Sequence, residues 1–548
     1  NPLAPPSAGV TEKLTSSEMA RAPRKGKAQP PLVASHFQEA LVLNQYLISL
    51  FGIDPLVTHK DGTHNVRPLE IIAKTLRGAT AGIDKNGKHH FLTALLSHLP
   101  PHAALTPAEL ERYDANLVAH TRTINARRKH KGEIAWKYFQ WLTLLFVEIY
   151  LDRYFNDRQG LCVALNAFIE RFNQHHLTQG RETGIGAYAV EDLNKLCLQN
   201  ATGSGKTLLM HVNLLQFAHH ARATGQTDDY SRVIVLSPNE RLSEQHEREL
   251  RENGFYPEPL RQESDLISRG QNALDVPLLT EITKLADEQK VKQMAVDSFG
   301  DANLLLVDEG HRGMSGSDWK SKRDKLAAKG FTFEYSATFK QAVKAANDRA
   351  LAESYAKAVL FDYSYRYFYA DGYGKDYRIF NLPKDELAHK DTYLTAALLA
   401  FYQQLRMYTE AGKRYAGYNL EKPLWVFVGA SVSGRKVDEE SVSPSDVAQI
   451  LDFLARFLAH REAFTTLIDT VLNGNSQQTG LLDAQGRDIF IQSFPYLKSL
   501  KHSAAQLYAD ICQRLFHAPG GGHLVVERVK GDSGELLLKV GAVSYTHL

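Results

Sequence analysis

The segment 200–207, which reads N-A-T-G-S-G-K-T, constrains this chain more than any other stretch. The mostly apolar run Leu196–Gln199 leads into it, and the run Leu208–Leu215 leads out of it. This order predicts a strand, a tight glycine loop and a helix, which is the setting of a phosphate-binding loop. Glycines let backbone N–H groups approach an anion, and the helix start adds the positive end of its dipole. We therefore expect this loop to bind nucleotide phosphates.

Each residue of the loop has an expected role. The Lys206 ammonium can reach the β- and γ-phosphates, and the Thr207 hydroxyl can bind Mg²⁺. Asn200 stands where the general pattern has glycine, which favours a helicase-type loop over a kinase or GTPase loop. The residues expected to contact the nucleotide are Thr202, Gly203, Ser204, Gly205, Lys206 and Thr207.

A second motif follows the apolar run Asn303–Val307 and reads Asp308-Glu-Gly-His311. Two carboxylates after a buried strand are the expected partners of a phosphate loop. We expect Asp308 to bind Mg²⁺ and Glu309 to orient and deprotonate the attacking water. Asp308, Glu309 and Lys206 are thus the predicted catalytic residues.

Other polar residues also follow predicted strands. Phe331–Tyr335 leads into Ser336-Ala-Thr338, whose hydroxyl groups we expect to bond the His311 side chain and link nucleotide state to a second lobe. Five residues after other predicted strands are candidates for contacts to nucleic-acid phosphates: Pro238, Asn239, Gln245, Thr283 and Lys284. The alternative is that these residues cap helices or occupy ordinary surface positions.

The hydrophobic pattern divides the chain into four parts. Residues 1–32 are expected to be a disordered tail, because they are rich in Pro, Ser, Lys and Arg. Residues 33–183 are expected to form a helical domain, with helices at Pro107–Asn125 and Trp136–Phe155. Residues 184–383 predict an α/β lobe with a parallel sheet covered by helices on both faces. Residues 384–548 predict a partial second lobe, with a central strand at Pro423–Gly429.

Composition indicates the cellular environment and limits the possible partners. The net charge of +2 by itself excludes no class of partner. The three cysteines, Cys162, Cys197 and Cys512, have no metal-binding spacing and indicate a reducing, cytoplasmic environment. The longest apolar run is too short to span a membrane, so we expect no membrane partner. From the missing initiator Met we expect a fragment or a processed chain, and from the unusual end Val543–Leu548 we expect a truncation.

Two further stretches have alternative interpretations. The basic run Arg127–Lys131 could contact phosphates or form a solvated loop. The aromatic-rich stretch Tyr363–Tyr377 could stack single-stranded bases, or it could be a twisted strand and turn that closes the sheet.

Taken in order, T-G-S-G-K-T, S-P-N, D-E-G-H and S-A-T resemble the motifs of superfamily 2 helicases. The chain is more narrowly similar to DEAD/DEAH-box-like helicases related to the restriction (Res) subunit of type III restriction enzymes. Gly310 differs from the alanine of DEAD/DEAH boxes. The resemblance implies two RecA-like lobes that clamp ATP and Mg²⁺, with His311, Ser336 and Thr338 coupling the lobes. It also implies DNA as partner, with RNA not excluded, and a methyltransferase or specificity subunit as a candidate partner.

The resulting expectation is an ATP-dependent DNA helicase or translocase, the motor part of a type III restriction-like or defence system. Two alternatives stay open: an ATP-gated nucleic-acid clamp that does not translocate, and a P-loop ATPase without a nucleic-acid partner. The family's lobe-two arginine, which reaches the γ-phosphate, has no counterpart that we can place before Leu548. Asp532, Glu535 and Lys539 lack the E-x-K spacing, so no nuclease is expected.

Overall fold

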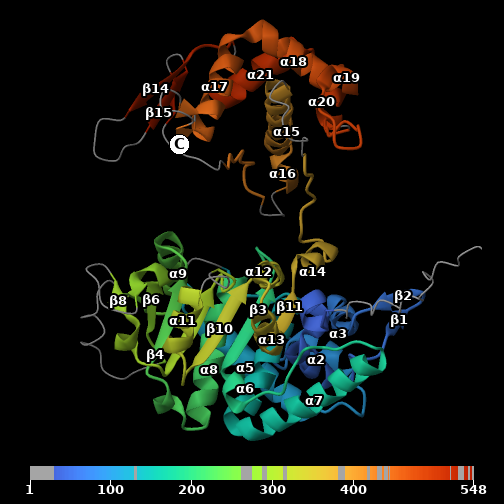
Figure 1. The fold of residues 1–548 in the computed structure, drawn as a ribbon, viewed down its shortest axis with the longest axis vertical. Helices are drawn as coiled ribbons and strands as arrows, with labels where there is room; N and C mark the ends of the chain where they lie inside the picture. Colours follow the sequence, from blue (N-terminus) through green and yellow to red (C-terminus); the bar gives the residue numbers. More distant parts are fainter. Residues whose placement is uncertain are drawn as a thin grey trace, which may run out of the picture. The chain divides into compact units, whose positions relative to one another are not determined.

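The computed structural model divides the chain into two compact units, residues 1–375 and 376–548 (Figure 1). The division falls a few residues before the boundary predicted at 383. The expected tail lies outside the described residues up to position 29. The described residues are 30–128, 132–260, 274–286, 293–312, 317–380, 389–415, 420–428, 435–436, 442–443, 445–490, 492–518, 520–528, 536–540 and 543–545.

The first unit is built on a seven-stranded sheet in which all neighbouring strands are parallel. The strand order is β11-β3-β10-β9-β4-β6-β5. Strands β3, β4, β9 and β10 lie where the apolar runs predict strands, at residues 196–199, 233–237, 303–307 and 331–335, and the fold is the predicted α/β, RecA-like class. The strand bounds are β3 Lys195–Asn200, β4 Arg232–Ser237, β5 Glu258–Pro259, β6 Pro277–Glu281, β9 Asn303–Asp308, β10 Phe331–Ser336 and β11 Val359–Tyr363.

The helix α5 (Pro107–Asn125) shows how local chemistry sets an element boundary. Thr106 accepts a hydrogen bond from the Glu109 backbone N–H, and the Glu109 carboxylate accepts one from the Thr106 backbone N–H. This capping box, with proline in the first turn, starts the helix where the sequence predicted it.

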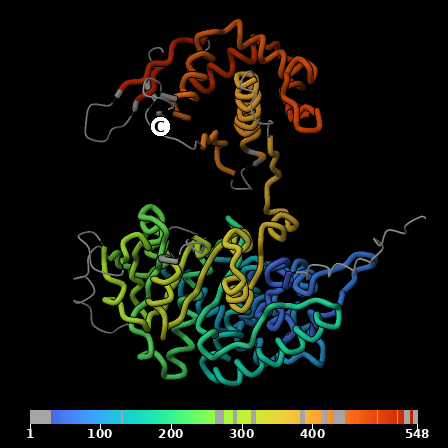
Figure 2. The backbone as a smooth tube through the Cα atoms, viewed as in Figure 1, coloured from blue at the N-terminus to red at the C-terminus, as the bar shows by residue number. Residues whose placement is uncertain are grey.

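The N-terminal helices and the sheet share one hydrophobic core. Helix α6 (Tyr138–Asn156) is apolar on nearly all sides and is buried accordingly. On its way through the core, the Phe146 ring lies 5.3 Å from the Phe361 ring of β11, and the Tyr154 ring lies 5.0 Å from the Phe331 ring of β10. Figure 2 traces the chain from these helices (blue to teal) into the strands (green to yellow). The expected helical region and the expected lobe therefore form one compact unit.

The remaining elements of the first unit surround this core (Figure 1). The helix bounds are α1 Leu32–Ser35, α2 Val42–Ser49, α3 Pro68–Arg77, α4 His90–Leu96, α7 Arg158–Thr178, α8 Lys206–Ala223, α9 Glu240–Glu252, α11 Ser317–Leu326, α12 Phe339–Ala346, α13 Arg349–Ala358 and α14 Tyr365–Ala370. The short strands outside the main sheet are β1 His59–Asp61, β2 His64–Val66, β7 Leu285–Ala286 and β8 Met294–Ala295.

The second unit has a core of its own, formed mainly by helices. Its helices are α15 Lys390–Glu410, α16 Gly412–Tyr415, α17 Asp446–Ala459, α18 Arg461–Asn473, α19 Ser476–Thr479, α20 Pro495–Ser499 and α21 Ala504–Phe516. Its strands are β12 Arg435–Lys436, β13 Val442–Ser443, β14 Leu524–Arg528, β15 Leu536–Val540 and β16 Val543–Tyr545.

The strand predicted at Pro423–Gly429 is wrong for its described part, because residues 420–428 have no regular secondary structure. Leu424 and Val428 are 81% and 92% exposed, respectively. An apolar run becomes a strand only where a neighbouring strand pairs with its backbone. In the described part of this unit the strands pair antiparallel. The parallel sheet that a second RecA-like lobe requires is not among these residues.

The turn residues Lys530-Gly-Asp-Ser-Gly534 between two apolar runs predict a hairpin, and these runs form the antiparallel pair β14–β15. Its turn, Lys530–Gly534, lies outside the described residues. None of the helices that the structure describes combines the length and apolarity needed to cross a membrane.

Candidate nucleotide-binding site

The phosphate loop connects the end of β3, at Asn200, to the start of α8, at Lys206. Gly203 and Gly205 have φ values of 84° and 92°, which L side chains rarely adopt. A Cβ on Gly205 would also lie 2.6 Å from Nε2 of Gln140. The glycines of the motif are therefore required by the backbone. Lys206 Nζ donates a hydrogen bond of 3.5 Å to the carbonyl oxygen of Asn200, folding the lysine over the loop.

The loop offers both exposed and buried polar groups. Thr202 and Gly203 are exposed, and Lys206 and Thr207 are partly exposed. Both amide atoms of Asn200 and the Ser204 hydroxyl are buried and have no hydrogen-bond partner among the described residues. Buried polar atoms without partners cost free energy. These orphaned atoms fit a ligand that brings hydrogen-bonding groups, as a hydrated Mg²⁺–triphosphate would.

Asp308 lies at the end of β9, on the same edge of the sheet as the phosphate loop. Its Oδ2 accepts a hydrogen bond of 2.9 Å from His246 Nε2, and its Oδ1 accepts one of 2.9 Å from the Glu309 backbone N–H. Burial raises the pKa of Asp308. The hydrogen bond and charge of His246, with smaller contributions from the Glu309 N–H and the Lys206 charge, lower the pKa by more than burial raises it, so the net shift is downward. Asp308 is therefore an ionised carboxylate within the electrostatic reach of Lys206.

Glu309 follows with a φ of 50°, a left-handed conformation that is uncommon for residues other than glycine. Backbone strain of this kind collects at functional sites, where the surroundings hold it in place. Glu309 Oε2 lies 3.2 Å from His311 Nδ1. The strained backbone thus turns the second carboxylate toward the histidine of the motif.

The third motif meets the second across neighbouring strands. Ser336, at the end of β10, has its Oγ 2.8 Å from His311 Nδ1. The Thr338 backbone N–H donates to Ser336 Oγ at 3.0 Å, so the described contact of Thr338 in this network is through its backbone. The structure thus brings His311 and Ser336 together as the sequence predicted, and Thr338 contacts Ser336 through its backbone.

A buried ionic cluster around Glu334 contacts the backbone of the second motif. Glu334 on β10 lies 2.8 Å from Lys195 Nζ and 3.6 Å from Arg323 Nη1, and it accepts a hydrogen bond of 2.6 Å from Tyr355 OH. Burial raises the pKa of Glu334, while Lys195 and Arg323 lower it, and the net shift is downward. Arg323 also donates to the Gly310 carbonyl oxygen at 2.9 Å. The cluster therefore fixes the backbone that carries the two carboxylates.

The same cluster explains the glycine at position 310. A Cβ there would lie 3.0 Å from both Cβ and Oε2 of Glu334. Such contacts are tighter than ordinary packing, so an alanine would require the ionic cluster to shift. Gly310 is thus matched to the glutamate beneath it.

The residues predicted to contact nucleic acid follow strands β4 and β6. In the sheet these two strands lie on the other side of β9 from β3, the strand that leads into the phosphate loop. Asn239 Oδ1 accepts from the Leu242 backbone N–H at 3.0 Å, so this side chain caps α9, which was the alternative interpretation. Lys284 Nζ is paired with Glu281 Oε2 at 2.6 Å. The other three candidates are Pro238, which is buried, and Gln245 and Thr283, which are exposed.

Several residues of the site were not predicted. His246 is surrounded by charged residues in an exposed-looking helix, yet it is buried and contacts Asp308. Gln140, at the start of α6, donates from Nε2 to the Ser204 carbonyl oxygen at 2.9 Å. Neither residue belongs to a local motif, so only their spatial neighbours identify them.

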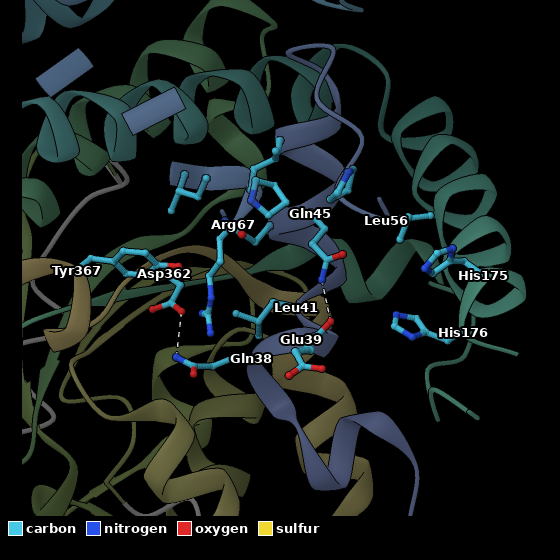
Figure 3. A pocket seen from close by; sticks show the side chains of 15 residues that line it. Gln38, Glu39, Leu41, Gln45, Leu56, Arg67, His175, His176, Asp362 and Tyr367 are labelled. Atoms are coloured by element: carbon cyan, nitrogen blue, oxygen red, sulfur yellow. Dashed lines mark hydrogen bonds between the residues drawn. The ribbon is translucent and has the colours of Figure 1, made fainter. Parts of the chain in front are cut away.

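A separate cavity of about 300 Å³ lies between α2, α3, α7 and β11 (Figure 3). Asp362 forms part of its wall and accepts hydrogen bonds from Gln38 Nε2 at 3.2 Å and Gln199 Nε2 at 2.7 Å. Burial raises the pKa of Asp362. Gln199 lies in β3 and directly precedes Asn200, so the hydrogen bond between Gln199 and Asp362 connects the wall of this cavity to the strand that leads into the phosphate loop.

Together the sheet, the glycine loop and the paired carboxylates define a P-loop NTPase of the RecA-like class. Residues 159–341 match the family model described as "Type III restriction enzyme, res subunit". The matched segment contains all four predicted motifs, and it is a helicase-family ATPase domain related to the Res subunit of type III restriction enzymes.

No curated protein matches the chain. Among solved structures, the Sulfolobus solfataricus SWI2/SNF2 ATPase core in complex with dsDNA matches with 11% identity and a TM-score of 0.23, over 59% of this chain and 66% of that chain. The Pyrococcus furiosus Hef helicase domain matches with 14% identity and a TM-score of 0.25, over 59% of this chain and 70% of that chain. Likenesses this weak support no further conclusion.

Proposed function

We propose that this chain is an ATP-dependent DNA helicase or translocase, the motor part of a type III restriction-like or defence system in the cytoplasm. The observation that carries the proposal is the placement of Lys206 and Asp308. They come from separate motifs, yet both lie at the carboxyl ends of parallel strands on one edge of the sheet, Lys206 in the helix that follows β3 and Asp308 at the end of β9. A cation and an ionised carboxylate at this edge suit a Mg²⁺–ATP complex.

In the proposed reaction, the backbone N–H groups of residues 202–207 and the Lys206 ammonium bind the phosphates. Thr207 and Asp308 hold the metal, and His246 keeps the Asp308 carboxylate in place through its 2.9 Å hydrogen bond. Bound Mg²⁺ supplies charge neutralisation on the phosphates. Glu309 orients the attacking water and accepts its proton.

The contact between His311 and Ser336 is the proposed coupling element. Glu309 and Ser336 both lie within hydrogen-bonding distance of His311 Nδ1. A proton or water that binds Glu309 therefore competes with the Glu309–His311 contact, and through His311 it affects the His311–Ser336 contact that reaches β10. We propose that the exposed side chains of Gln245 and Thr283 face nucleic acid on the adjoining half of the same edge, and that a methyltransferase or specificity subunit is a partner.

The test is steady-state ATP turnover measured with double-stranded DNA of increasing length, with single-stranded DNA and with RNA. A motor predicts DNA-stimulated turnover that depends on DNA length and is abolished in Lys206→Ala. Stimulation that ignores length would instead support a clamp that does not translocate. Turnover that no nucleic acid changes would support an ATPase without a nucleic-acid partner.

A further inference from the structure

Four aromatic side chains from two separate parts of the chain gather beside the phosphate loop. Phe139 lies in the first turn of α6, whereas Tyr363 ends β11, Phe368 lies in α14 and Tyr373 follows that helix. The Phe139 and Tyr363 rings stack with centroids 4.0 Å apart and an angle of 5°. The Tyr373 ring lies 5.6 Å from Phe139 and 5.5 Å from Phe368. We call these four side chains the aromatic platform.

Two contacts attach the platform to the loop. Phe368 Cζ lies 3.8 Å from the position that a Cβ on Gly203 would take, so its ring is at ordinary contact distance from this exposed glycine of the loop. Gln140, the neighbour of Phe139, donates from Nε2 to the Ser204 carbonyl oxygen at 2.9 Å. A ligand whose phosphates occupy the loop would therefore have the platform next to it.

The platform is held in place although Tyr373 is 42% exposed. The turn at Gly372, with φ of 80°, returns the chain so that the Tyr373 backbone N–H donates to the Phe368 carbonyl oxygen at 3.1 Å. Asp371 fixes this turn from inside, with a side chain only 5% exposed. It accepts hydrogen bonds from Tyr138 OH, from Tyr363 OH at 2.6 Å and from Arg77 Nε at 2.7 Å.

We propose that the exposed side of the aromatic platform, formed by Tyr373 and the partly exposed Phe368 over the buried rings of Phe139 and Tyr363, binds the base of the nucleotide whose phosphates the loop 200–207 holds. The inference rests on the proposed nucleotide binding and adds the site of the base. A preorganised ring that is partly exposed gains contact area when a base stacks on it, and little ordering is required. Every nucleobase has a π-face, so stacking alone tolerates different bases. The platform should therefore accept ATP and GTP with similar affinity.

The test compares two ligands by isothermal titration calorimetry in the presence of Mg²⁺: ADP, which has a base, and inorganic pyrophosphate, which has none. The variants are Tyr373→Ala and Phe368→Ala in the full chain. The matched control is Tyr369→Ala, a tyrosine of α14 with 48% exposure whose ring lies 6.1 Å from that of Tyr365. Thermal unfolding of each variant checks that the fold is kept.

Loss of one stacking partner should weaken ADP binding by about 5- to 100-fold, while pyrophosphate binding and the Tyr369→Ala variant stay at wild-type values. Unchanged ADP affinity in both variants would overturn the proposal, as would equal losses for ADP and pyrophosphate. Wild-type protein that binds ADP no tighter than pyrophosphate would overturn the platform but leave the phosphate site standing. Wild-type protein that binds neither ligand would instead overturn the proposed function itself.

Single-stranded nucleic acid is the competing occupant, since bases of a strand also stack on exposed aromatic rings. Fluorescence anisotropy of a labelled oligothymidylate, measured with the same variants, distinguishes the two. Loss of oligonucleotide binding with ADP affinity unchanged would contradict the proposal. Loss of ADP affinity with oligonucleotide binding unchanged would support it.

Discussion

Replacing Glu334 by Gln is the most informative perturbation of the fold beneath the site. The substitution removes the carboxylate charge and keeps the side-chain shape. Lys195, 2.8 Å away, and Arg323, 3.6 Å away, then lose their shared counter-charge. Removing one partner of a buried ion pair costs about 3–5 kcal/mol, because the remaining charge is left uncompensated.

The expected change in melting temperature follows from the size of the unit. Unfolding entropy is about 2.1 cal/mol/K per residue, so a unit of this size has roughly 0.7 kcal/mol/K. A loss of about 3–5 kcal/mol then lowers Tm by roughly 4–7 °C. Differential scanning calorimetry measures this shift, with the transition of the first unit assigned by its response to Mg²⁺–ADP.

The matched control is Asp301→Asn, which removes a carboxylate from an exposed pair with Lys329 at 2.9 Å. Exposed pairs contribute about 0–1 kcal/mol, so this variant should melt within about 1–2 °C of the wild type. Equal shifts for Glu334→Gln and Asp301→Asn would refute the reasoning that the buried cluster stabilises the unit. So would a Glu334→Gln variant as stable as the wild type.

Three further changes test other parts of the structure. Gly310→Ala places a methyl group 3.0 Å from Glu334. This overpacking should lower the free energy of unfolding, measured in urea, by about 1–3 kcal/mol and should slow ATP hydrolysis. A variant with wild-type stability and wild-type rate would contradict this prediction. Burial raises the pKa of Glu148, but the imidazole of His120, 3.6 Å away, and the 2.7 Å hydrogen bond from His220 lower it to about 2 from 4.5. Because the folded pKa is depressed, the stabilisation is complete above about pH 4.5 and is lost as the pH falls toward 2. The difference in unfolding free energy between wild type and Glu148→Gln should thus narrow between pH 6 and pH 3, and a constant difference would argue against the assignment. His246→Ala should raise the Mg²⁺ concentration needed for half-maximal ATP hydrolysis by about 10–100-fold, whereas an unchanged Mg²⁺ requirement would show that the contact with Asp308 is unimportant.

The sequence predicted the parts of the fold that depend on neighbours along the chain. The Thr106–Glu109 capping box sets the start of α5 because its partners are three residues apart. The strands β3, β4, β9 and β10 were found because each is a short apolar run that ends in a polar motif. For the same reason the phosphate loop and the Asp308–His311 motif could be assigned from local patterns.

The failures concern contacts between distant segments. The apolar run at Pro423–Val428 has strand-like composition, but none of the strands that the structure describes pairs with it, and composition does not reveal a missing partner. The cluster of Lys195, Arg323 and Glu334 joins residues far apart in sequence, so no local spacing indicates it. The aromatic stretch after β11 was interpreted as a strand and turn or a nucleic-acid contact. Its position beside Gly203 could come only from the folded structure.

The central claim is that Lys206 and Asp308 serve one Mg²⁺–nucleotide complex. Isothermal titration calorimetry of a slowly hydrolysed ATP analogue, with and without Mg²⁺, measures this directly in wild type, Lys206→Ala and Asp308→Asn. The account predicts one site in the wild type. It predicts about 10- to 150-fold weaker binding in Lys206→Ala, since a charged hydrogen bond is lost, and loss of the Mg²⁺ dependence in Asp308→Asn. Wild-type affinity and wild-type Mg²⁺ dependence in both variants would contradict it.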